Sequence, residues 1–550
     1  MTAAAARSAP AGRWLHGPVS DLLFGCGVWY FFAFAVLCLY GEQIRGPGGM
    51  VFLPILMLLF GTPHYGATLL RVYDQRADRQ QYRFFALWAT VAVLAMFGVG
   101  VWVPVAGSAI LTLYMTWSPW HYAGQNYGLA VMFLRRRGVE ITPRAKRLFY
   151  LTFFLSFLLT FLLAHGTERV ANFTPLLYTD AGYQFLSIGL PQPYTGWVTY
   201  GVLAAYLGCV GASVWLLARG ARSFGDLTPS LLLVGSQALW FVIPFGARYW
   251  RIGQGFGPLS IHNEGWYFLW IAIAHSVQYL WVTSSFAEGR SDWKGMTPYL
   301  GKTLLAGACV WALPIVLFSP DLLGRVSYDA GLAVLVASAV NIHHFILDGA
   351  IWKLRDGRVA RLLMRSRATE RDDAIQPEGG WLRPVVWATG AACVAMLFVG
   401  YWEHEVRLQY ALHQKDTAKS GQILDRLRYI GRESAEGRAS QAELLYAEGR
   451  PGAAELAYRR SLGLHPKAET WFSLGKLQYE QRNYDAAIGS FEEAIALRPH
   501  EDAVYYYMGR AWLEQGRTAE AVAAFERAAE LAPTRGIYRR MLAKARSAGA

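Results

Sequence analysis

The sequence predicts an all-α protein, in which about eleven membrane-spanning helices precede a C-terminal α-solenoid of helical repeats. Three observations predict this fold. Of the 550 residues, 54% are hydrophobic and only 17% are charged; apolar runs of about 20 residues recur as far as Trp402; and the tail repeats itself at a fixed spacing. We therefore expect a polytopic domain over 1–402, a linker or degenerate helical pair over 403–433, and a repeat domain over 434–550.

The predicted spans come first along the chain. A run of about 20 apolar residues is long enough to cross a bilayer as a helix. Only the segment from Pro104 to Gly107 separates the third run from the fourth, so the predicted number is eleven, give or take one. The runs lie at about 21–40, 50–72, 84–104, 106–134, 148–165, 195–218, 228–247, 262–285, 303–319, 328–352 and 384–402.

The net charge of +13 is best explained by membrane topology, because the basic excess lies in loops of the membrane part and not in the tail. Arg135 to Arg137 and the loop from Lys353 to Arg383 are the strongest basic loops. Positive charge favours the cytoplasmic side, so we expect a cytoplasmic N-terminus in a bacterial inner membrane. An odd number of spans then places the tail in the periplasm or outside the cell. No nucleic-acid partner is expected.

The tail contains two copies of one pattern at a spacing of 34 residues. Trp471, Gly475 and Phe491 in the first copy correspond to Tyr505, Gly509 and Phe525 in the second, and each copy ends in a proline, Pro499 or Pro533. Small residues where two helices cross, large apolar residues and a terminal proline at this period resemble tetratricopeptide repeats. The resemblance covers about 434–535 and implies a surface that recruits a protein partner.

Five histidines fall inside predicted spans two, four, eight and ten: His64, His121, His275, His343 and His344. Their depths differ by less than about two helical turns, so the four spans can direct imidazoles to one point. Ionisable side chains at such depth relay protons, pair with each other or bind metals. Imidazole suits Fe, Cu or Zn; we expect Fe(II) first. A polar packing network and a transport or proton path remain open alternatives.

Other polar residues extend this set. Asp348 follows His344 by four residues and can act as a ligand or as the acceptor of an imidazole N–H. Gln125 follows His121 at the same spacing, and Gln278 follows His275 by three. Aromatic neighbours can line an apolar substrate channel or serve only as packing; they are Tyr65, Trp120, Tyr122, Tyr127 and Tyr279.

The segments GTPHYG at His64 and WHYAGQ at His121 resemble motifs of the Brp/Blh family of membrane carotenoid dioxygenases. That resemblance implies a helical membrane fold with one non-haem iron on four histidines and an O2-dependent reaction on a lipophilic substrate. His64, His121 and His275 have counterparts in the family. The family has a further histidine where this chain has Tyr279, so His343 or His344 would have to supply it.

The predicted function is therefore a His-ligated, metal-dependent oxidoreductase that acts on a membrane lipid or an isoprenoid-like substrate, with catalytic roles for Asp348, Gln125 and Tyr279. Two alternatives stay open. One is a non-enzymatic scaffold or assembly factor that presents the repeats. The other is a lipid-linked glycosyltransferase, which would need an adjacent acidic pair on an external loop. The first external loop has only Glu42, and the long loop after the fifth span has Glu168 and Asp180, which are not adjacent. The remaining histidines are expected at the surface: His16, His165, His262, His404, His413, His465 and His500.

Overall fold

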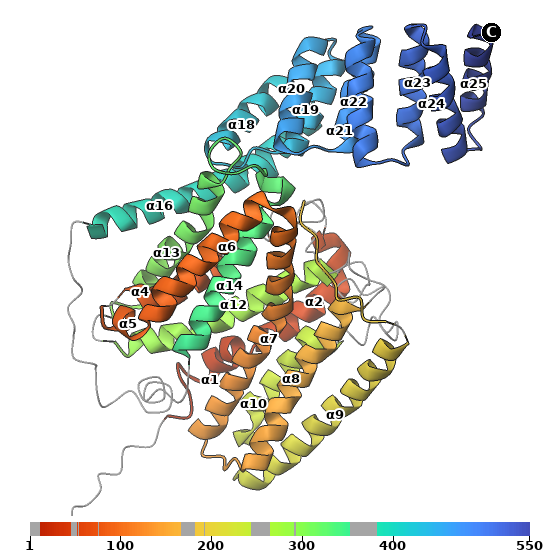
Figure 1. The fold of residues 1–550 in the computed structure, drawn as a ribbon. Coiled ribbons are helices and arrows are strands. Elements are labelled where there is room, and N and C mark those ends of the chain that lie inside the picture. Colours follow the sequence, from red (N-terminus) through yellow and green to blue (C-terminus); the bar gives the residue numbers. More distant parts are fainter. Residues whose placement is uncertain are drawn as a thin grey trace, which may run out of the picture. The chain divides into compact units, whose positions relative to one another are not determined.

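A computed structural model describes residues 12–45, 52, 54–74, 76–166, 182–191, 193–243, 264–290, 293–352 and 382–549 (Figure 1). Throughout these ranges the regular elements are helices. The described residues also form one isolated β-bridge, between Gly166 and Leu190. The chain divides into two compact units, the first of Met1–Pro314 with Ala333–Val399 and the second of Ile315–Leu332 with Gly400–Ala550. The segment Ile315–Leu332 thus joins the second unit, although the sequence placed it among the membrane spans.

The first unit is a bundle built around α7, a helix of 33 residues that contacts α6, α8, α10 and α14. Val103 has an extended backbone just before Pro104 and separates α6 from α7, because a proline disfavours helical geometry in the residue before it. The α-helices of this unit are α1 (Pro18–Ser20), α2 (Val28–Arg45), α4 (Thr62–Tyr73), α5 (Arg76–Gln81), α6 (Thr90–Trp102), α7 (Pro104–Arg136), α8 (Pro143–His165), α9 (Tyr194–Gly220), α10 (Thr228–Gln237), α12 (Glu264–Glu288), α13 (Met296–Leu317), α14 (Ala333–Ile351) and α16 (Leu382–Tyr401).

Six helical segments among the described residues are long and apolar enough to cross a membrane. They are Phe84–Trp102, Pro143–His165, Tyr194–Gly220, Met296–Leu317, Tyr328–Ile351 and Pro384–His413. The bent pair Pro18–Gly25 and Val28–Tyr40, at 47°, would make a seventh. The expected eleven spans exceed this number because other predicted runs form shorter helices, contain more polar residues or extend beyond the described ranges.

Short π-helical turns begin or end several helices of the first unit. The turn η2 (Met57–Gly61) leads directly into α4, and η3 (Phe84–Ala89) leads into α6. Others are η1 (Asp21–Gly25) before α2 and η7 (Ala238–Val242) after α10. A π-turn rotates the side chains that follow it relative to an uninterrupted α-helix. The face that α4 turns toward its neighbours therefore depends on η2.

Two glycines bring α4 and α13 into backbone contact. A Cβ atom added to Gly66 would lie 1.8 Å from the carbonyl oxygen of Thr303, and one added to Gly307 would lie 1.9 Å from that of Thr62. No other residue type fits at such distances. This contact fixes the position of α4 beside α13.

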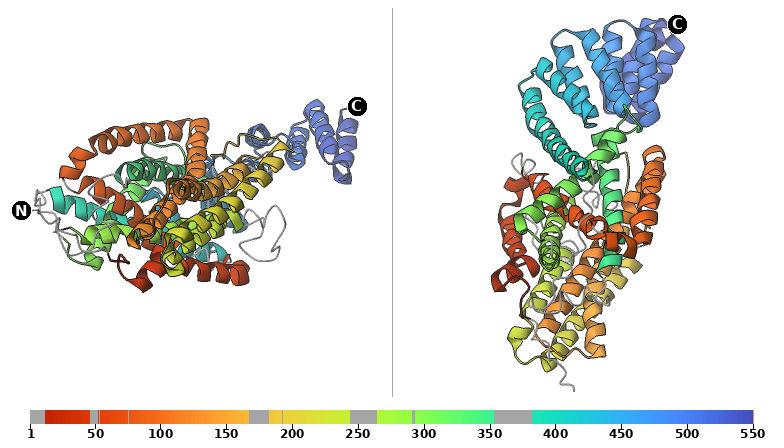
Figure 2. Two further views of the ribbon diagram at one scale, coloured as in Figure 1. Left: turned by 90° about the horizontal axis from the view of Figure 1, so that it is seen from below. Right: turned by 90° about the vertical axis from the view of Figure 1, so that its left-hand side faces the viewer.

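The second unit consists of antiparallel helices in which each contacts the next along the chain (Figure 2). At the crossing of each repeat, a glycine of the first helix faces a phenylalanine of the second: Gly475 meets Phe491, and Gly509 meets Phe525. The helices are α17 (Gln409–His413), α18 (Thr417–Tyr429), α19 (Ala435–Ala447), α20 (Pro451–Leu464), α21 (Ala468–Glu480), α22 (Tyr484–Leu497), α23 (Asp502–Glu514), α24 (Thr518–Leu531) and α25 (Gly536–Ala548), preceded by the π-turn η11 (Trp402–Leu408).

The segment Ile315–Leu332 is attached to the start of this unit. Its π-turn η10 (Tyr328–Leu332) contacts α19, and Asp329 accepts a hydrogen bond of 2.8 Å from the hydroxyl of Ser434, the N-cap of α19. A Cβ atom added to Gly431 would lie 2.5 Å from the carbonyl oxygen of Ile315. This loop between two apolar helices therefore belongs structurally to the repeats.

Candidate metal centre

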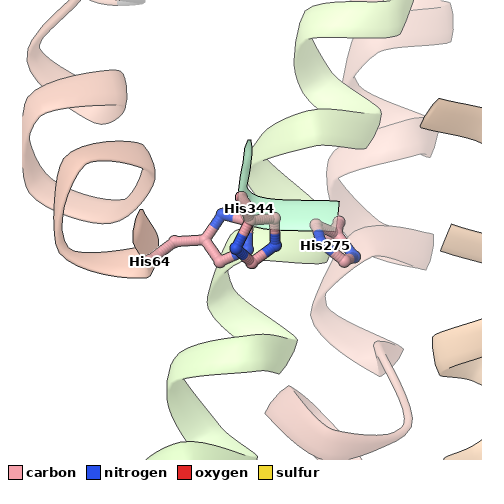
Figure 3. Close-up of side chains that lie close together, drawn as sticks. All are labelled: His64, His275 and His344. Atoms are coloured by element: carbon pink, nitrogen blue, oxygen red, sulfur yellow. The ribbon is translucent and has the colours of Figure 1, made fainter. Parts of the chain in front are cut away.

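Four helices of the first unit bring four imidazoles together in its interior. His64 comes from α4, His121 from α7, His275 from α12 and His344 from α14. His64, His275 and His344 are at most 2% exposed, and the side chain of His121 is 12% exposed. Figure 3 shows that the rings of His64, His275 and His344 converge from three separate helices. Of the five histidines predicted to share a site, the structure brings these four together.

The separations between the rings suit a shared ion. The ring centroids lie 4.2 Å apart for His64 and His344, 4.9 Å for His64 and His275, and 5.0 Å for His121 and His275. One nitrogen from each of His64, His275 and His344 lies within 4.8 Å of the others. Three nitrogens spread evenly around one ion, each about 2.1 Å from it, are at most about 3.6 Å apart. Side-chain shifts of less than about 1 Å therefore bring these nitrogens into coordination.

Two of the rings are oriented by hydroxyl groups on their outer nitrogens. Ser276 donates its only hydroxyl proton to the carbonyl oxygen of Ala272 at 2.8 Å, so it accepts from Nδ1 of His64 at 3.2 Å. Thr68 lies 2.9 Å from Nδ1 of His344. Hydrogen bonds of this kind fix the tautomer in metal sites, with the free lone pair on Nε2.

The inner nitrogens lack a hydrogen-bond partner among the described residues. Across the described residues, the buried Nε2 atoms of His64, His121 and His344 and both ring nitrogens of His275 lack a hydrogen bond. A buried polar atom without a partner costs about 1–3 kcal/mol. Such atoms on four converging rings are therefore costly unless something binds them, and a cation that prefers nitrogen ligands would satisfy one nitrogen of each imidazole together.

Asp348 completes the constellation. Its Oδ1 accepts a hydrogen bond of 2.6 Å from the hydroxyl of Tyr279 and one of 3.2 Å from Thr68. Its Oδ2 lies 3.4 Å from Nε2 of His344 and 3.7 Å from Nε2 of His121. One carboxylate oxygen is thus held by hydroxyl donors, while the other faces the imidazoles and is placed to act as a further ligand.

Tyr279 contacts the histidine cluster through both its hydroxyl group and its ring. Its hydroxyl accepts a hydrogen bond of 3.1 Å from the indole of Trp352, and its ring centroid lies 4.5 Å from that of His64. His344 lies beside it, with 5.3 Å between the ring centroids. The tyrosine is therefore part of the cluster through its contacts with Asp348 and His64.

Aromatic rings cover the histidines on other sides. Tyr122 stacks on His275 at 4.2 Å, and Phe345 stacks on His121 at 4.4 Å. Tyr65 lies 4.8 Å from His64 and donates a hydrogen bond of 2.9 Å to Asn341. Of the remaining aromatic candidates, Tyr127 packs against Phe149 and Phe153, and Trp120 stacks on Trp117.

Two predicted site residues lie in other hydrogen-bond networks. Nε2 of His343 lies 2.8 Å from the hydroxyl of Thr90, which in turn lies 2.8 Å from the hydroxyl of Tyr73. Gln125 donates a hydrogen bond of 2.7 Å to Gln278, which donates to the carbonyl oxygen of Gly25 at 2.9 Å. Adjacent residues on a helix point about 100° apart, so only His344 of the histidine pair faces the cluster.

The prediction that His165 lies at the surface is wrong. It is 2% exposed, and its two ring nitrogens contact the hydroxyl of Thr116 at 3.1 Å and the backbone N–H of Ile188 at 3.2 Å. His262, Glu168 and Asp180 lie outside the described residues, as does the side chain of Glu42.

Three residues that support the cluster were not predicted from the sequence: Thr68, Ser276 and Trp352. A signal existed for two of them. Thr68 follows His64 by four residues, and Trp352 follows Asp348 by four, so each shares a helix face with a predicted site residue. Ser276 follows His275 directly, and no spacing rule connects it to His64.

Comparisons with known proteins concern the second unit. A sequence model of the tetratricopeptide repeat family matches residues 472–535. The small glutamine-rich tetratricopeptide repeat-containing protein 2 of Mycosarcoma maydis is 30% identical over 112 residues, which are 19% of this chain and 32% of that protein. The chain thus spans about a third of the length of this curated relative. The C-terminal part carries tetratricopeptide repeats, as the sequence predicted, and such repeats indicate protein–protein interaction.

Two solved structures also resemble the chain. The crystal structure of MamA protein covers 28% of this chain and 82% of its own, with 17% identity and a TM-score of 0.26. The APC/C hetero-tetramer Cut9-Hcn1 covers 86% of this chain and 97% of its own, with 13% identity and a TM-score of 0.22.

Proposed function

We propose that the protein is an integral-membrane, metal-dependent oxidoreductase that acts on a lipophilic substrate and recruits a protein partner through its repeats. The observation that carries the proposal is the convergence of four imidazoles from four helices, each with a buried ring nitrogen that lacks a hydrogen bond. His64, His121, His275 and His344 would hold the ion, with Asp348 as a further ligand or as an orienting acceptor.

Fe(II) is the ion that this donor set favours. Imidazole suits Fe, Cu and Zn, and a carboxylate beside histidines is typical of non-haem Fe(II) sites. A bound Fe(II) would supply the one-electron chemistry that reactions of O2 require. The resemblance of GTPHYG and WHYAGQ to the Brp/Blh motifs supports the same choice. We infer that His344 provides the imidazole that is missing at Tyr279.

The protein's own residues have three tasks in this proposal. Thr68 and Ser276 orient the imidazoles through their Nδ1 atoms. Tyr279 donates a hydrogen bond to Oδ1 of Asp348, so that Oδ2 of Asp348 faces the histidine ligands. The rings of Tyr122 and Phe345 exclude water from the histidines and present an apolar surface to a substrate such as a membrane lipid or an isoprenoid.

A membrane location supports the choice of substrate. Large apolar side chains on the outer helices are exposed, among them Trp88 at 61%, Trp197 at 66% and Leu207 at 60%. Such surfaces are stable in a bilayer and aggregate in water. We place the first unit in a bacterial inner membrane with the N-terminus in the cytoplasm and the repeats outside it, because the basic loops favour this orientation.

Metal analysis of detergent-purified protein tests the proposal. Wild type, after anaerobic exposure to Fe(II) and removal of unbound ion, is expected to retain near-stoichiometric iron. His64→Ala and His275→Ala should each lower iron retention at least tenfold, because each removes a ligand. His165→Ala is the matched control, since it also removes a buried imidazole but lies outside the cluster; it should retain iron like wild type.

Two results would contradict the proposal. Wild type that retains neither iron, copper nor zinc would remove the metal site and favour a scaffold that presents the repeats. Equal retention by wild type and both cluster variants would place the metal elsewhere. The thermal unfolding temperature of each variant shows whether the protein is still folded. A variant that unfolds like wild type but retains less iron has lost the ion and not the fold.

A further inference from the structure

The start of α8 carries an excess of positive charge. Arg144, Lys146 and Arg147 lie among the first residues of this helix, and its first turn has no acidic residue. The N-terminal end of a helix dipole is positive, so anions are stabilised there and cations are destabilised. The only acidic residue from Pro104 to His165 is Glu140, which is exposed. The start of α8 therefore favours an anion that its own helices do not supply.

Several other basic residues of the first unit are already bound within the chain. Arg136 and Arg137, at the end of α7 and directly after it, donate hydrogen bonds to backbone carbonyl oxygens. By contrast, Lys146 and Arg147 are exposed, and neither forms an ion pair with a carboxylate in the described part of the chain. Further arginines of the unit pair with carboxylates: Arg13 with Asp226, Arg71 with Asp78 and Arg290 with Asp74.

Lys146 and Arg147 border an open cavity of about 420 Å³, a volume typical of ligand sites. Its other lining residues are Tyr127 of α7 and Tyr150 and Leu151 of α8, and these two helices lie side by side (Figure 1). Tyr150 and Leu151 each follow one of the cations by four residues, so each shares a helix face with it. We call this cavity the α8 pocket. It is cationic toward the start of α8 and apolar one turn further along.

A line of aromatic rings continues from the apolar end of the α8 pocket. Tyr127 and Tyr150 meet edge to face, with 5.3 Å between their ring centroids. Further along α8, Phe154 stacks on Tyr150 at 6.3 Å, and Phe157 lies 6.0 Å from Phe154. Trp120 of α7, which is 48% exposed, lies 6.5 Å from Phe157. None of these five residues is fully buried, so the line follows the outer surface of the bundle.

We propose that the α8 pocket binds one anionic phospholipid, with its phosphate between Lys146 and Arg147 and an acyl chain along the line of rings. Charge complementarity identifies the headgroup, because adjacent lysine and arginine side chains without a counterion favour a phosphate. Basic pockets between membrane helices on the cytoplasmic side are suited to such headgroups.

The order of side chains along α8 identifies the rest of the occupant. Cations come first, then a tyrosine, then purely apolar rings, as phosphate, glycerol and acyl chain follow one another in a phospholipid. Tyrosine is enriched where the headgroups of a bilayer meet its hydrocarbon core. A soluble phosphate ester would satisfy the cations but leave the apolar end uncovered. The proposal rests on the proposed membrane location of the first unit and does not involve the metal centre.

Native mass spectrometry of the detergent-solubilised, full-length protein tests this site, because it counts the lipid molecules that stay bound. Titration with phosphatidylglycerol and phosphatidylcholine of identical acyl chains compares an anionic with a zwitterionic headgroup. Wild type should bind its first phosphatidylglycerol at least fivefold more tightly than its first phosphatidylcholine. Lys146→Gln/Arg147→Gln should weaken phosphatidylglycerol binding at least fivefold and remove the preference, because both charges that meet the phosphate are lost.

The matched control is Arg144→Gln/Arg222→Gln. It removes the same amount of charge from two exposed cations, one on α8 and one in the loop after α9, and neither lines the α8 pocket. This variant should bind phosphatidylglycerol like wild type.

Equal affinity of wild type for the two lipids, or equal weakening in the two double variants, would overturn the proposal. Displacement of the lipid by inorganic phosphate or glycerol 3-phosphate at micromolar concentration would overturn it as well and assign the pocket to a soluble phosphate. The thermal unfolding temperature shows that each variant is folded. The iron retained by the same preparations reports separately on the metal centre.

Discussion

The adjacent residues His343 and His344 belong to two separate polar networks. Thr90, the first residue of α6, lies 2.8 Å from a ring nitrogen of His343, whereas Thr68 on α4 lies 2.9 Å from one of His344. The local chemistry of the two sites is the same, a threonine hydroxyl against an imidazole. Of the two threonines, only Thr68 also donates a hydrogen bond to Asp348, which lies beside the converging histidines. This pair of threonines therefore offers a matched comparison.

Thr68→Val should lower the affinity for iron by about 10- to 100-fold, the usual cost of removing a hydrogen-bond partner from a metal-bound imidazole. Valine keeps the shape of threonine but leaves Nδ1 of His344 without its hydroxyl. Thr90→Val makes the same change at His343 and should leave iron affinity unchanged. Competition with a chelator of known affinity measures both. Equal effects of the two substitutions would show that the hydroxyl of Thr68 does not orient a ligand.

The contact between α4 and α13 predicts a second effect. Gly307→Ala should destabilise the first unit by about 1–3 kcal/mol or more, because its Cβ would meet the carbonyl oxygen of Thr62 at 1.9 Å, and backbone cannot yield easily. The displaced α4 carries His64, so iron retention should fall as well. Thermal unfolding in detergent and metal analysis measure the two effects.

Gly301→Ala is the control on the same helix, since nothing lies within 4 Å of its added Cβ. It should be neutral or stabilising by up to about 1 kcal/mol, as alanine favours helices over glycine. A loss of stability equal to that of Gly307→Ala would mean that α13 itself, and not its contact with α4, is sensitive to the change.

The repeats allow a test of the same kind. Gly475→Ala should destabilise the second unit by about 1–3 kcal/mol, because its Cβ would lie 2.5 Å from the ring of the fully buried Phe491. Gly489→Ala, on α22, meets no atom within 4 Å and should be neutral or stabilising. Hydrogen exchange of α21 and α22 compares them. Protection that falls equally in both variants would contradict the packing argument.

The sequence predicted those features that a periodic or compositional rule imposes. The glycine and phenylalanine of each repeat are predictable because only a small residue fits at the helix crossing. The histidines are conspicuous because imidazoles are rare among apolar residues. Which of His343 and His344 faces the cluster depends on the rotation of α14, which no local pattern gives. His165 was misplaced because a position at the end of an apolar run does not reveal the loop that covers it.

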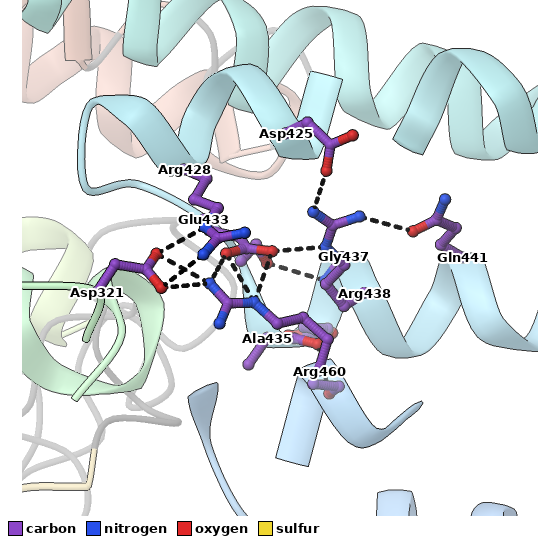
Figure 4. Close-up of polar contacts among 12 residues, drawn as sticks. Asp321, Asp425, Arg428, Glu433, Ala435, Gly437, Arg438, Gln441 and Arg460 are labelled. Atoms are coloured by element: carbon purple, nitrogen blue, oxygen red, sulfur yellow. Dashed lines mark hydrogen bonds and ion pairs between the residues drawn. The ribbon is translucent and has the colours of Figure 1, made fainter. Parts of the chain in front are cut away.

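The segment Ile315–Leu332 was assigned to the wrong unit for a related reason. Its neighbours in sequence are apolar helices, but its Asp321 pairs with two arginines more than one hundred residues away. Asp321 accepts from Arg428 at 2.9 and 3.1 Å and from Arg460 at 2.9 and 3.2 Å (Figure 4). Such long-range charge pairs have no signature in a single sequence.

These pairs make the start of the repeat unit sensitive to acid. Burial tends to raise the pKa of Asp321, but hydrogen bonds from Arg428 and Arg460 outweigh it and hold the pKa below its usual value of 3.8. A carboxyl whose pKa is depressed by folding contributes stability above its unfolded pKa and loses it as the pH falls through the folded pKa. The contribution of Asp321 should therefore be complete at pH 6 and decline as the pH falls from about 3.8 through the lower pKa of the folded state.

Asp321→Asn should accordingly lower the protection of α18 to α20 by about 1 kcal/mol at pH 6. The difference from wild type should shrink toward zero as the pH falls below about 3.8. Hydrogen exchange read by mass spectrometry and corrected for intrinsic rates measures it, with α24 of the same chain as internal reference. Glu530→Gln, which breaks an exposed pair with Arg527 on α24, should leave α18 to α20 unchanged. A difference independent of pH would mean that Asp321 acts by packing and not by charge.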